Sequence, residues 1–554
     1  MRTAGLRSSA GRVAVACCLV LAASTSAGCG GGGCKCGGDW GPYEPADVPA
    51  DLAPDLPADV PADVPNDALP TTPGGLPLSL PFAYQRPDVG TPLTDAEVTA
   101  FTKTITGFWK RVDYFTWAAE TSAGVDASTG LPDWLIWWQD FDAVKAGDTV
   151  TFQANAGGGS HNNAGPTGRV LTSALSGYLL SGDPAMRALV EQYTNSVTAC
   201  MKGFVFDEND PVDWLIARNV TGPAQAFTLP SGRKKAVRYD AWHVDATAWN
   251  ADRFEYAHNP TWGDVWVTNK RSKDDMPYWF RMAAWLPYVI ELAPDASVRA
   301  AATEAYGLLQ KSARDVVDSG WQFRTKDANG AVFTPEGHDL NNFAFYLDLM
   351  PDAECDARLT VALLGYGDTR DVDCGSGQGS PYDDIAGSTN YFNYNIITHF
   401  HESAILFALI TGHAQAARAL LDGLVTRIAR YRDPASGEAG QAQPYFARDI
   451  AVWLMRGAAV GLPLTSDEAR LVQKFHVQSV TGYDAFPNWN LWSPSVADGT
   501  YNCDGGFRPP DPTDGIAIDD VATLLEYCWS PFRNPAGARF VDCDVVRDPT
   551  RWGL

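Results

Sequence analysis

Two stretches of this chain, ALSGYLLSGD at Ala174–Asp183 and AILFALITGH at Ala404–His413, share one pattern. Each has Ala followed by an aliphatic residue, three variable positions, two aliphatic residues, Ser or Thr, Gly and a polar residue. An apolar run that closes on glycine is typical of a helix C-terminus, because glycine adopts the left-handed conformation that ends a helix. The repetition predicts two equivalent helices, each the first helix of a hairpin.

A second helix pattern follows each of these endings. After Gly182, Asp183 and Pro184 supply a polar cap and a first-turn proline. A capping box of Thr94 and Glu97 predicts a separate opening helix. The same order of helix, turn and helix recurs further along the chain, with turns at Pro294–Asp295, Pro351–Asp352 and Gly412 and before Ser466.

Repeated helical hairpins must bury their apolar faces on their neighbours, as an open solenoid or as a closed ring. Here the repeats are irregular and separated by long aromatic loops, which favours a ring. We predict an all-α fold, an (α/α) toroid of about six helical hairpins. Over most of 90–480 this architecture resembles the six-hairpin superfamily of carbohydrate-active proteins, although no signature of one family is present as a string. That superfamily includes glycoside hydrolases, unsaturated glucuronyl hydrolases and the toroid domains of polysaccharide lyases.

Residues 1–28 have the form of an export signal, with a basic start and an apolar run from Val13 to Ala23 that is too short to span a membrane. SAGC at Ser26–Cys29 resembles the lipobox of bacterial lipoproteins, which implies lipidation of Cys29, although Ser26 stands where leucine is usual. Ordinary cleavage after Ala27 is the alternative and would give a secreted protein. We expect a cell-envelope lipoprotein, anchored to the membrane and facing the periplasm or the cell surface.

A spacer is predicted between this anchor and the domain. Pro45 to Pro65 reads PADVPADLAPDLPADVPADVP, in which frequent prolines block helix and sheet pairing while the aspartates repel one another. We therefore expect an anchor region and extended spacer over 29–79, and a toroid domain with a disulfide-bearing C-terminal extension over 80–554.

Six of the eleven cysteines fall within the predicted domain. An even number in an exported chain suggests disulfides. Proximity in sequence favours Cys355 with Cys374, and one pair within Cys503, Cys528 and Cys543 that leaves a partner for Cys200.

The net charge of −24 bears on the ligand. Nucleic acid binding is excluded, because phosphate contacts need a basic footprint. A neutral or weakly charged glycan fits better than a strongly anionic one, although Arg233, Lys234 and Lys235 form a local basic cluster. We expect a monomer without cofactor or metal. In THFHES, His399 and His401 lie two residues apart and would point to opposite sides of a helix, so His401 is predicted to line the core or a cleft.

The loops before the predicted first helices are rich in aromatic and amide side chains, at 132–142, 157–168, 240–266, 334–342, 383–395 and 483–492. Aromatic faces can stack on sugar rings, and amides bind hydroxyl groups; packing in the core is the alternative for any one aromatic residue. The predicted substrate-binding residues are Trp134, Trp138, Asn162, Asn163, Trp242, Asn342, Tyr391 and Trp489.

Glycoside hydrolysis needs two carboxyl groups on either side of the bond, one of them with a raised pKa. Among the candidates in the loops and at helix entries we favour Asp274 and Glu336, and we expect Asp275 to cap a helix. The other candidates are Asp133, Asp140, Asp142, Asp339, Glu402 and Asp449.

A polysaccharide lyase is the second hypothesis. Toroid lyases use Asn to neutralise a uronate and His or Tyr as base and acid, and SHNN and STNYFNYN contain these residue types. The candidates are His161, His338 and Tyr394, with helix capping as the alternative for the histidines. The third hypothesis is a surface lipoprotein that binds glycan or protein through its aromatic loops without catalysis.

Overall fold

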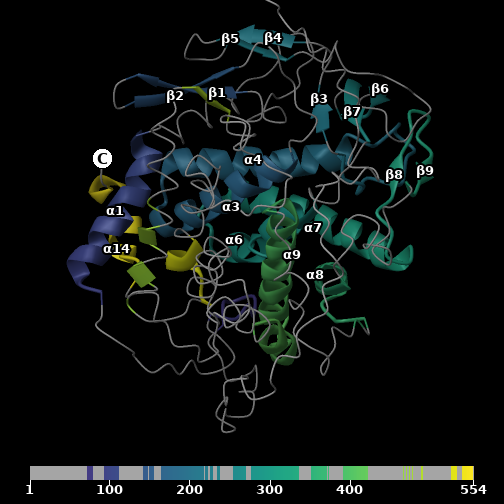
Figure 1. The fold of residues 1–554 in the computed structure, drawn as a ribbon. Coiled ribbons are helices and arrows are strands. Elements are labelled where there is room, and N and C mark those ends of the chain that lie inside the picture. The colour runs from purple at the N-terminus through teal and green to yellow at the C-terminus, as the bar shows by residue number, and fades with distance from the viewer. Residues whose placement is uncertain are drawn as a thin grey trace, which may run out of the picture.

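The computed structural model describes the part of the chain that Figure 1 draws as ribbon. The described residues are 71–78, 93–111, 141–146, 149–154, 164–217, 219–221, 225–228, 234–237, 254–261, 263–269, 276–335, 351–370, 372, 391–421, 466, 469–470, 473–474, 477, 488–490, 526–532 and 540–552.

Helices dominate this part of the chain, as expected for an all-α protein. None of the described helices is long and apolar enough to cross a bilayer. The helices are α1 (Asp95–Arg111), α3 (Ala164–Ser181), α4 (Pro184–Lys202), α5 (Met276–Ala283), α6 (Leu286–Leu292), α7 (Ala296–Asp318), α8 (Pro351–Tyr366), α9 (Tyr391–Ile410), α14 (Cys543–Val546) and the 3-10 turn η8 (Pro549–Arg551).

Short strands fill connections between the helices. They pair antiparallel in four small sheets, of order β10-β1-β2, β3-β7-β6, β4-β5 and β8-β9. Their bounds are β1 (Phe141–Ala146), β2 (Thr149–Ala154), β3 (Asn219–Thr221), β4 (Gln225–Thr228), β5 (Lys234–Val237), β6 (Phe254–Asn259), β7 (Gly263–Thr268), β8 (Thr325–Lys326), β9 (Val332–Phe333) and β10 (Asn488–Asn490).

The two matching stretches end their helices as predicted. Gly182 follows α3 with φ +66°, and its N–H donates to the carbonyl of Tyr178 at 2.7 Å. Gly412 follows α9 with φ +81°. The predicted cap of α4 is also present, since Asp183 Oδ1 accepts from the backbone N–H of Met186 at 3.1 Å.

The helices pack in two successions, α3–α5–α9 and α4–α7–α8. In the first, α5 contacts both α3 and α9; in the second, α7 contacts both α4 and α8. At one end of α4, Arg187 Nε lies 3.2 Å from Asp295 Oδ1, just before α7 begins, and Tyr178 OH also donates to Asp295. We call this the turn end, because the α3–α4 and α6–α7 turns meet here. Large aromatic side chains such as Trp279 and Trp285 are fully buried, so these two residues pack in the core and do not face a ligand.

The chain direction of α9 relative to α8 differs from that in a simple array of hairpins, in which consecutive helices are antiparallel. Asp356 of α8 contacts His401 near the middle of α9. The carbonyl of Gly367, just after α8, accepts from Nε2 of His413, just after α9, at 3.0 Å. Helices α8 and α9 therefore run in the same direction. The residues between them at 373–390 lie outside the described part.

The first and last parts of the chain are joined. The backbone N–H of Asp542 donates to Thr102 Oγ1 at 2.9 Å, and Thr99 Oγ1 donates to Asp542 Oδ2 at 2.8 Å. Asp542 also caps α14 by accepting from the N–H groups of Asp544 and Val545. The C-terminal helical segment thus packs against α1 (Figure 1).

The cysteines follow the sequence expectation in part. Cys528 and Cys543 form a disulfide, which is one of the pairings predicted within the C-terminal group. Cys355 is also in a disulfide, while Cys374 lies outside the described residues. The partner expected for Cys200 is not present, because Cys200 is a free thiol buried on α4. Burial raises the pKa of this thiol to about 12.

A buried lysine joins the connections that follow α4 and α7. Lys326 Nζ donates to the carbonyls of Phe204 at 2.8 Å and Val212 at 2.9 Å and forms an ion pair with Asp210. Its side chain is fully buried, and burial lowers the pKa of Lys326 while the Asp210 carboxylate opposes that change. The acidic stretch 207–213 therefore binds the ammonium group of Lys326.

The capping box of α1 gives a test of pH dependence. Glu97 accepts from the backbone N–H of Thr94 at 2.7 Å and from Arg470 Nε at 3.1 Å, and these contacts lower the pKa of Glu97 from 4.5 to about 2. A carboxyl group whose pKa is lowered by folding stabilises the protein above its unfolded pKa and loses this effect as pH falls. In urea unfolding, Glu97→Gln should be less stable than wild type at pH 6, and the difference should shrink from pH 4.5 towards 2. A difference that does not vary with pH would contradict this assignment.

The buried lysine gives a second test. Lys326→Met leaves the Asp210 carboxylate without its cation, so the free energy of unfolding should fall by about 3–5 kcal/mol. Lys202→Met is the matched control, because the ion pair of Lys202 with Glu304 lies at the surface and should be worth about 1 kcal/mol or less. Equal losses in the two variants, measured by urea unfolding, would show that Lys326 is not a buried charge.

Candidate functional site

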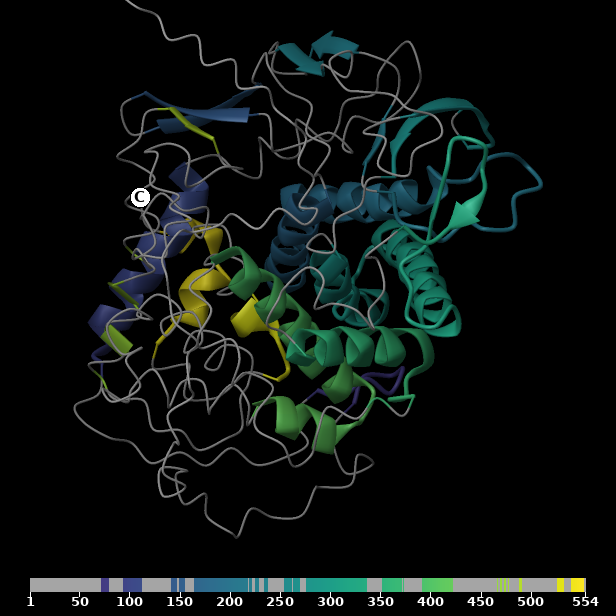
Figure 2. The same cartoon turned by 45° about the vertical axis from the view of Figure 1, so that its right-hand side comes forward.

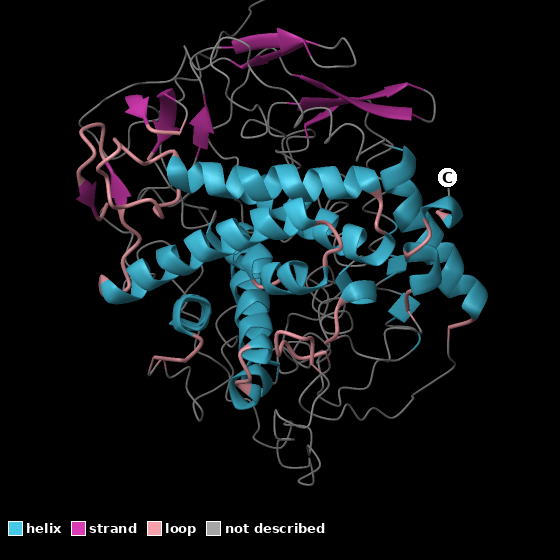
Figure 3. Ribbon diagram, turned by 180° about the vertical axis from the view of Figure 1, so that it is seen from behind, coloured by secondary structure: helices cyan, strands magenta, loops and turns pink. Residues whose placement is uncertain are grey.

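Most strands lie on one side of the helices. Figures 1 and 3 both show β1–β7 and β10 above α4, and we call this side the strand face. Local contacts agree at the C-terminal end of α4, where Asn259 of β6 donates from Nδ2 to the carbonyls of Lys202 at 2.8 Å and Val205 at 3.1 Å. The β3–β7–β6 sheet of the strand face is therefore fixed to α4 at the end away from the turn end.

Three of the six aromatic loops have described residues in this face. Loop 132–142 ends in β1, loop 240–266 contains β6 and much of β7, and loop 483–492 contains β10, while the described part of loop 157–168 belongs to α3. Two of these loops meet directly, although they are far apart in sequence. In the pairing of β1 with β10, Ala143 lies opposite Trp489 and Asp142 lies opposite Asn490.

This pairing places one predicted binding residue, Trp489, beside one candidate carboxyl residue, Asp142, at the level of the backbone. Strand β2 also contacts β5, which contains Lys234 and Lys235 of the basic cluster. The strand face thus brings together an aromatic, an acidic and a basic segment predicted from separate loops. Tyr391 and Tyr394 lie in the first turn of α9.

Most other predicted site residues lie outside the described residues. For Tyr391, Tyr394 and Trp489 the structure describes the backbone. The residues outside are Asp274, Glu336, His161 and His338 of the catalytic set, Trp134, Trp138, Asn162, Asn163, Trp242 and Asn342 of the binding set, and the lipidation candidate Cys29.

The one carboxyl candidate whose side chain is described, Glu402, belongs to a buried charge cluster. Arg281 of α5 lies between two carboxylates, with its Nε 3.4 Å from Glu402 Oε2 and its Nη2 3.2 Å from Glu526 Oε1. The three side chains are 3%, 4% and 1% exposed. Glu526 comes from the C-terminal segment, so one guanidinium joins three segments that are remote in sequence.

A second buried pair adjoins this cluster. His401 Nδ1 lies 3.0 Å from Asp356 Oδ2 of α8, and the two side chains are 2% and 0% exposed. His401 is thus buried in the core beside a carboxylate, as its apolar neighbours predicted. Within the described part of the chain, no group of three or more His, Cys, Asp or Glu side chains could hold a metal ion.

Burial decides what this cluster can do. A glycosidase carboxyl pair must reach the sugar and a water molecule. Glu402 and Glu526 share one cation and are closed to solvent, so we assign them to holding the helices together. Arg281 and Glu526 were not predicted from the sequence, although a lone arginine within the apolar run MPYWFRMAAWL is a signal of a buried ion pair.

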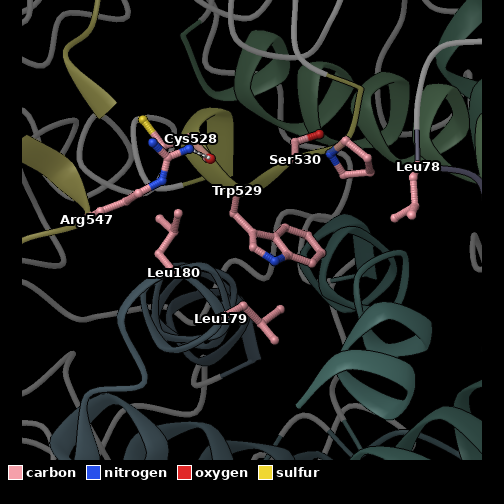
Figure 4. Close-up of a pocket in the computed structure, with 8 residues that line it drawn as sticks. Leu78, Leu179, Leu180, Cys528, Trp529, Ser530 and Arg547 are labelled. Atoms are coloured by element: carbon pink, nitrogen blue, oxygen red, sulfur yellow. Dashed lines mark hydrogen bonds between the residues drawn. The ribbon is translucent and has the colours of Figure 1, made fainter. Parts of the chain in front are cut away.

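A separate pocket lies at the turn end (Figure 4). It has a volume of about 390 Å³. Arg547 lines one side and donates to the carbonyl of Cys528 at 3.2 Å, while Trp529 lies in the centre of the view. None of the predicted site residues lines it. The lining residues are Leu78, Leu179, Leu180, Cys528, Trp529, Ser530, Pro531 and Arg547.

Comparisons with known proteins give no relative. No family model matches this chain, and no curated protein or solved structure matches it.

The buried cluster gives a test of its structural role. Arg281→Met leaves two carboxylates without their cation and should lower the free energy of unfolding by about 3–5 kcal/mol. Adding Glu402→Gln and Glu526→Gln to this variant should recover much of the loss, because no buried charge then lacks a counter-ion. Arg187→Met is the surface control, with an expected loss of about 1 kcal/mol or less, since Arg187 and Asp295 are 38% and 37% exposed. A loss for Arg281→Met no larger than for this control would contradict the assignment.

Proposed function

We propose that the protein is an exported, lipid-anchored glycoside hydrolase that acts on a neutral or weakly charged poly- or oligosaccharide. In this proposal the helices form an (α/α) toroid, and substrate binds at the strand face. The two successions of packed helices, and the contact of α14 with α1 that joins the two ends of the chain, support a closed helical arrangement. The parallel direction of α8 and α9 requires that such a toroid be irregular at this point.

The observation that carries the proposal is the pairing of β1 with β10. It joins two aromatic loops that the sequence placed in one substrate site, and sets Trp489 and Asn490 opposite Ala143 and Asp142. Stacking faces and hydrogen-bonding groups in close succession are what a sugar ring needs, because its ring faces are apolar and its edges carry hydroxyls. A chain with net charge −24 favours an uncharged glycan over a polyanion.

The catalytic roles go to Asp274 and Glu336. One carboxyl group protonates the leaving oxygen, and the other activates water or attacks the sugar. Asp274 comes just before α5 begins at Met276, and Glu336 follows the β8–β9 connection after α7. The buried Glu402 is excluded from these roles by its ion pair with Arg281.

The test of activity uses the mature chain incubated with neutral and uronic-acid polysaccharides. Release of reducing ends without ultraviolet absorbance supports hydrolysis, and Asp274→Asn and Glu336→Gln should then lower kcat by about 10²–10⁴-fold. Glu402→Gln is the matched control: as a structural residue it should lower stability and leave kcat within a few-fold of wild type.

Two other outcomes would overturn the hydrolase proposal. Absorbance of unsaturated uronates would indicate a lyase and direct mutagenesis to His161, His338 and Tyr394. Absence of any product, together with retention of the protein on an immobilised glycan, would indicate the non-catalytic binding lipoprotein.

Lipid anchoring is tested separately in a bacterial host fed a labelled fatty acid. The wild-type chain should carry the label and sediment with membranes, and Cys29→Ser should lose both properties, because the thiol of Cys29 is the acceptor. Cys34→Ser with Cys36→Ser is the control and should keep the label. A mature N-terminus at Gly28 would instead show ordinary cleavage and a secreted protein.

A further inference from the structure

The segment at 71–78, TTPGGLPL, is folded onto the helical domain ahead of the boundary expected near Leu80. It forms its own tight turn, in which the N–H of Gly75 donates to the carbonyl of Thr72 at 2.9 Å and the N–H of Thr72 donates to the carbonyl of Leu76 at 2.7 Å. Gly75 has φ +87°, a conformation that favours glycine. Thr72 and Pro77 are buried, so the segment is part of the packed structure. We call it the collar.

The collar is held by helix α6. Tyr288 OH donates to the carbonyl of Pro77 at 2.6 Å, and the N–H of Gly74 donates to Glu291 Oε2 at 3.0 Å. Two hydrogen bonds therefore fix where the chain before residue 71 joins the domain.

That place is the turn end. Tyr288 and Glu291 lie in the last two turns of α6, directly before the turn that contains Asp295. In Figure 1 the purple collar lies below α6, away from β1–β7, and Figure 2 shows the same separation. The β3–β7–β6 sheet of the strand face, in contrast, is fixed to the other end of α4 through Asn259.

Exposed apolar side chains mark the same region. Among the described residues, the large hydrophobic side chains that are exposed are Leu78 at 39% and Leu292 at 42%. Leu78 ends the collar and Leu292 ends α6, so they flank the contact of Pro77 with Tyr288. The surface beside the collar is therefore apolar at these two positions.

We propose that the turn end is the face of the domain that adjoins the membrane, and that the collar holds the strand face outward. This inference rests on the lipid anchoring proposed above. The spacer is rich in proline and aspartate, so the roughly 40 residues between Cys29 and Thr71 are expected to be extended, at about 3.1 Å per residue and ~130 Å at most. The folded domain has a diameter on the order of 60 Å. Because this tether joins the domain at the collar, the turn end is the part of the domain nearest the anchor, and the aromatic loops meet glycans that lie away from the anchoring membrane.

The test measures distances to a bilayer with an anchor that does not depend on lipidation. The mature chain carries a hexahistidine tag in place of Cys29 and binds vesicles that contain chelating lipid and a headgroup-linked energy acceptor. A fluorescent amino acid is introduced either at Leu292, at the turn end, or at Thr261, in the exposed β6–β7 turn. These positions are separated by about the length of α4, ~28 Å for its 19 residues.

Energy transfer to the bilayer should be higher from position 292 than from position 261. Deleting 45–65 should widen the difference, because a shorter tether brings the turn end against the lipid. Vesicles without chelating lipid give the baseline for both labelled proteins. Equal transfer from the two positions, or the reverse order, in the shortened chain would overturn the proposal.

The test is separate from those of the proposed function. The tag supplies the anchor, so a protein that is not lipidated in cells can still show the orientation, and no enzymatic activity is measured. Failure of lipidation would appear in the fatty-acid experiment, while failure of the orientation would appear here.

Discussion

The guanidinium of Arg281 is the charge on which the arrangement of the helices depends. A cation closed to solvent must have counter-ions beside it, and here they come from α9 and from the segment at 526–532. That segment carries Cys528, whose disulfide leads to α14, and α14 in turn packs on α1. Among the described residues, one connection of α1 to the central helices therefore passes through the C-terminal segment.

The two buried cations act at different places. Arg281 joins helices, whereas Lys326 joins connections, since its ammonium group binds backbone carbonyls after α4 as well as Asp210. A planar guanidinium suits two carboxylates that approach from different helices, and an ammonium group suits oxygens that converge on a point. The charge type at each site therefore fits the geometry of the groups around it.

Local patterns in the sequence predicted local structure well. The glycine endings at Gly182 and Gly412, the cap at Asp183 and the capping box at Thr94 are present, because each depends on a few adjacent residues. The direction of α9 beside α8 could not be predicted in this way, since it depends on packing between distant segments. The repeat of one helix ending suggested equivalent positions, but the same C-cap serves a helix that runs in either direction.

In the candidate site, too, local features could be predicted from the sequence and contacts between distant segments could not. Composition indicated which loops are aromatic, but not that 488–490 pairs as a strand with β1, because β pairing between segments more than 300 residues apart leaves no local pattern. Glu402 appeared suitable for catalysis by type and position in sequence. Its burial beside Arg281 became visible only in three dimensions, as did the role of the collar at 71–78.

The free thiol on α4 has a consequence for how this protein opens. Only a thiolate reacts with alkylating reagents and disulfides, and burial that raises the pKa of Cys200 to about 12 keeps this thiol protonated at neutral pH, inside a core that reagents do not enter. Cys200 becomes reactive when α4 separates from its neighbours. The chain thus carries a natural reporter whose rate of modification counts the openings of its central helices.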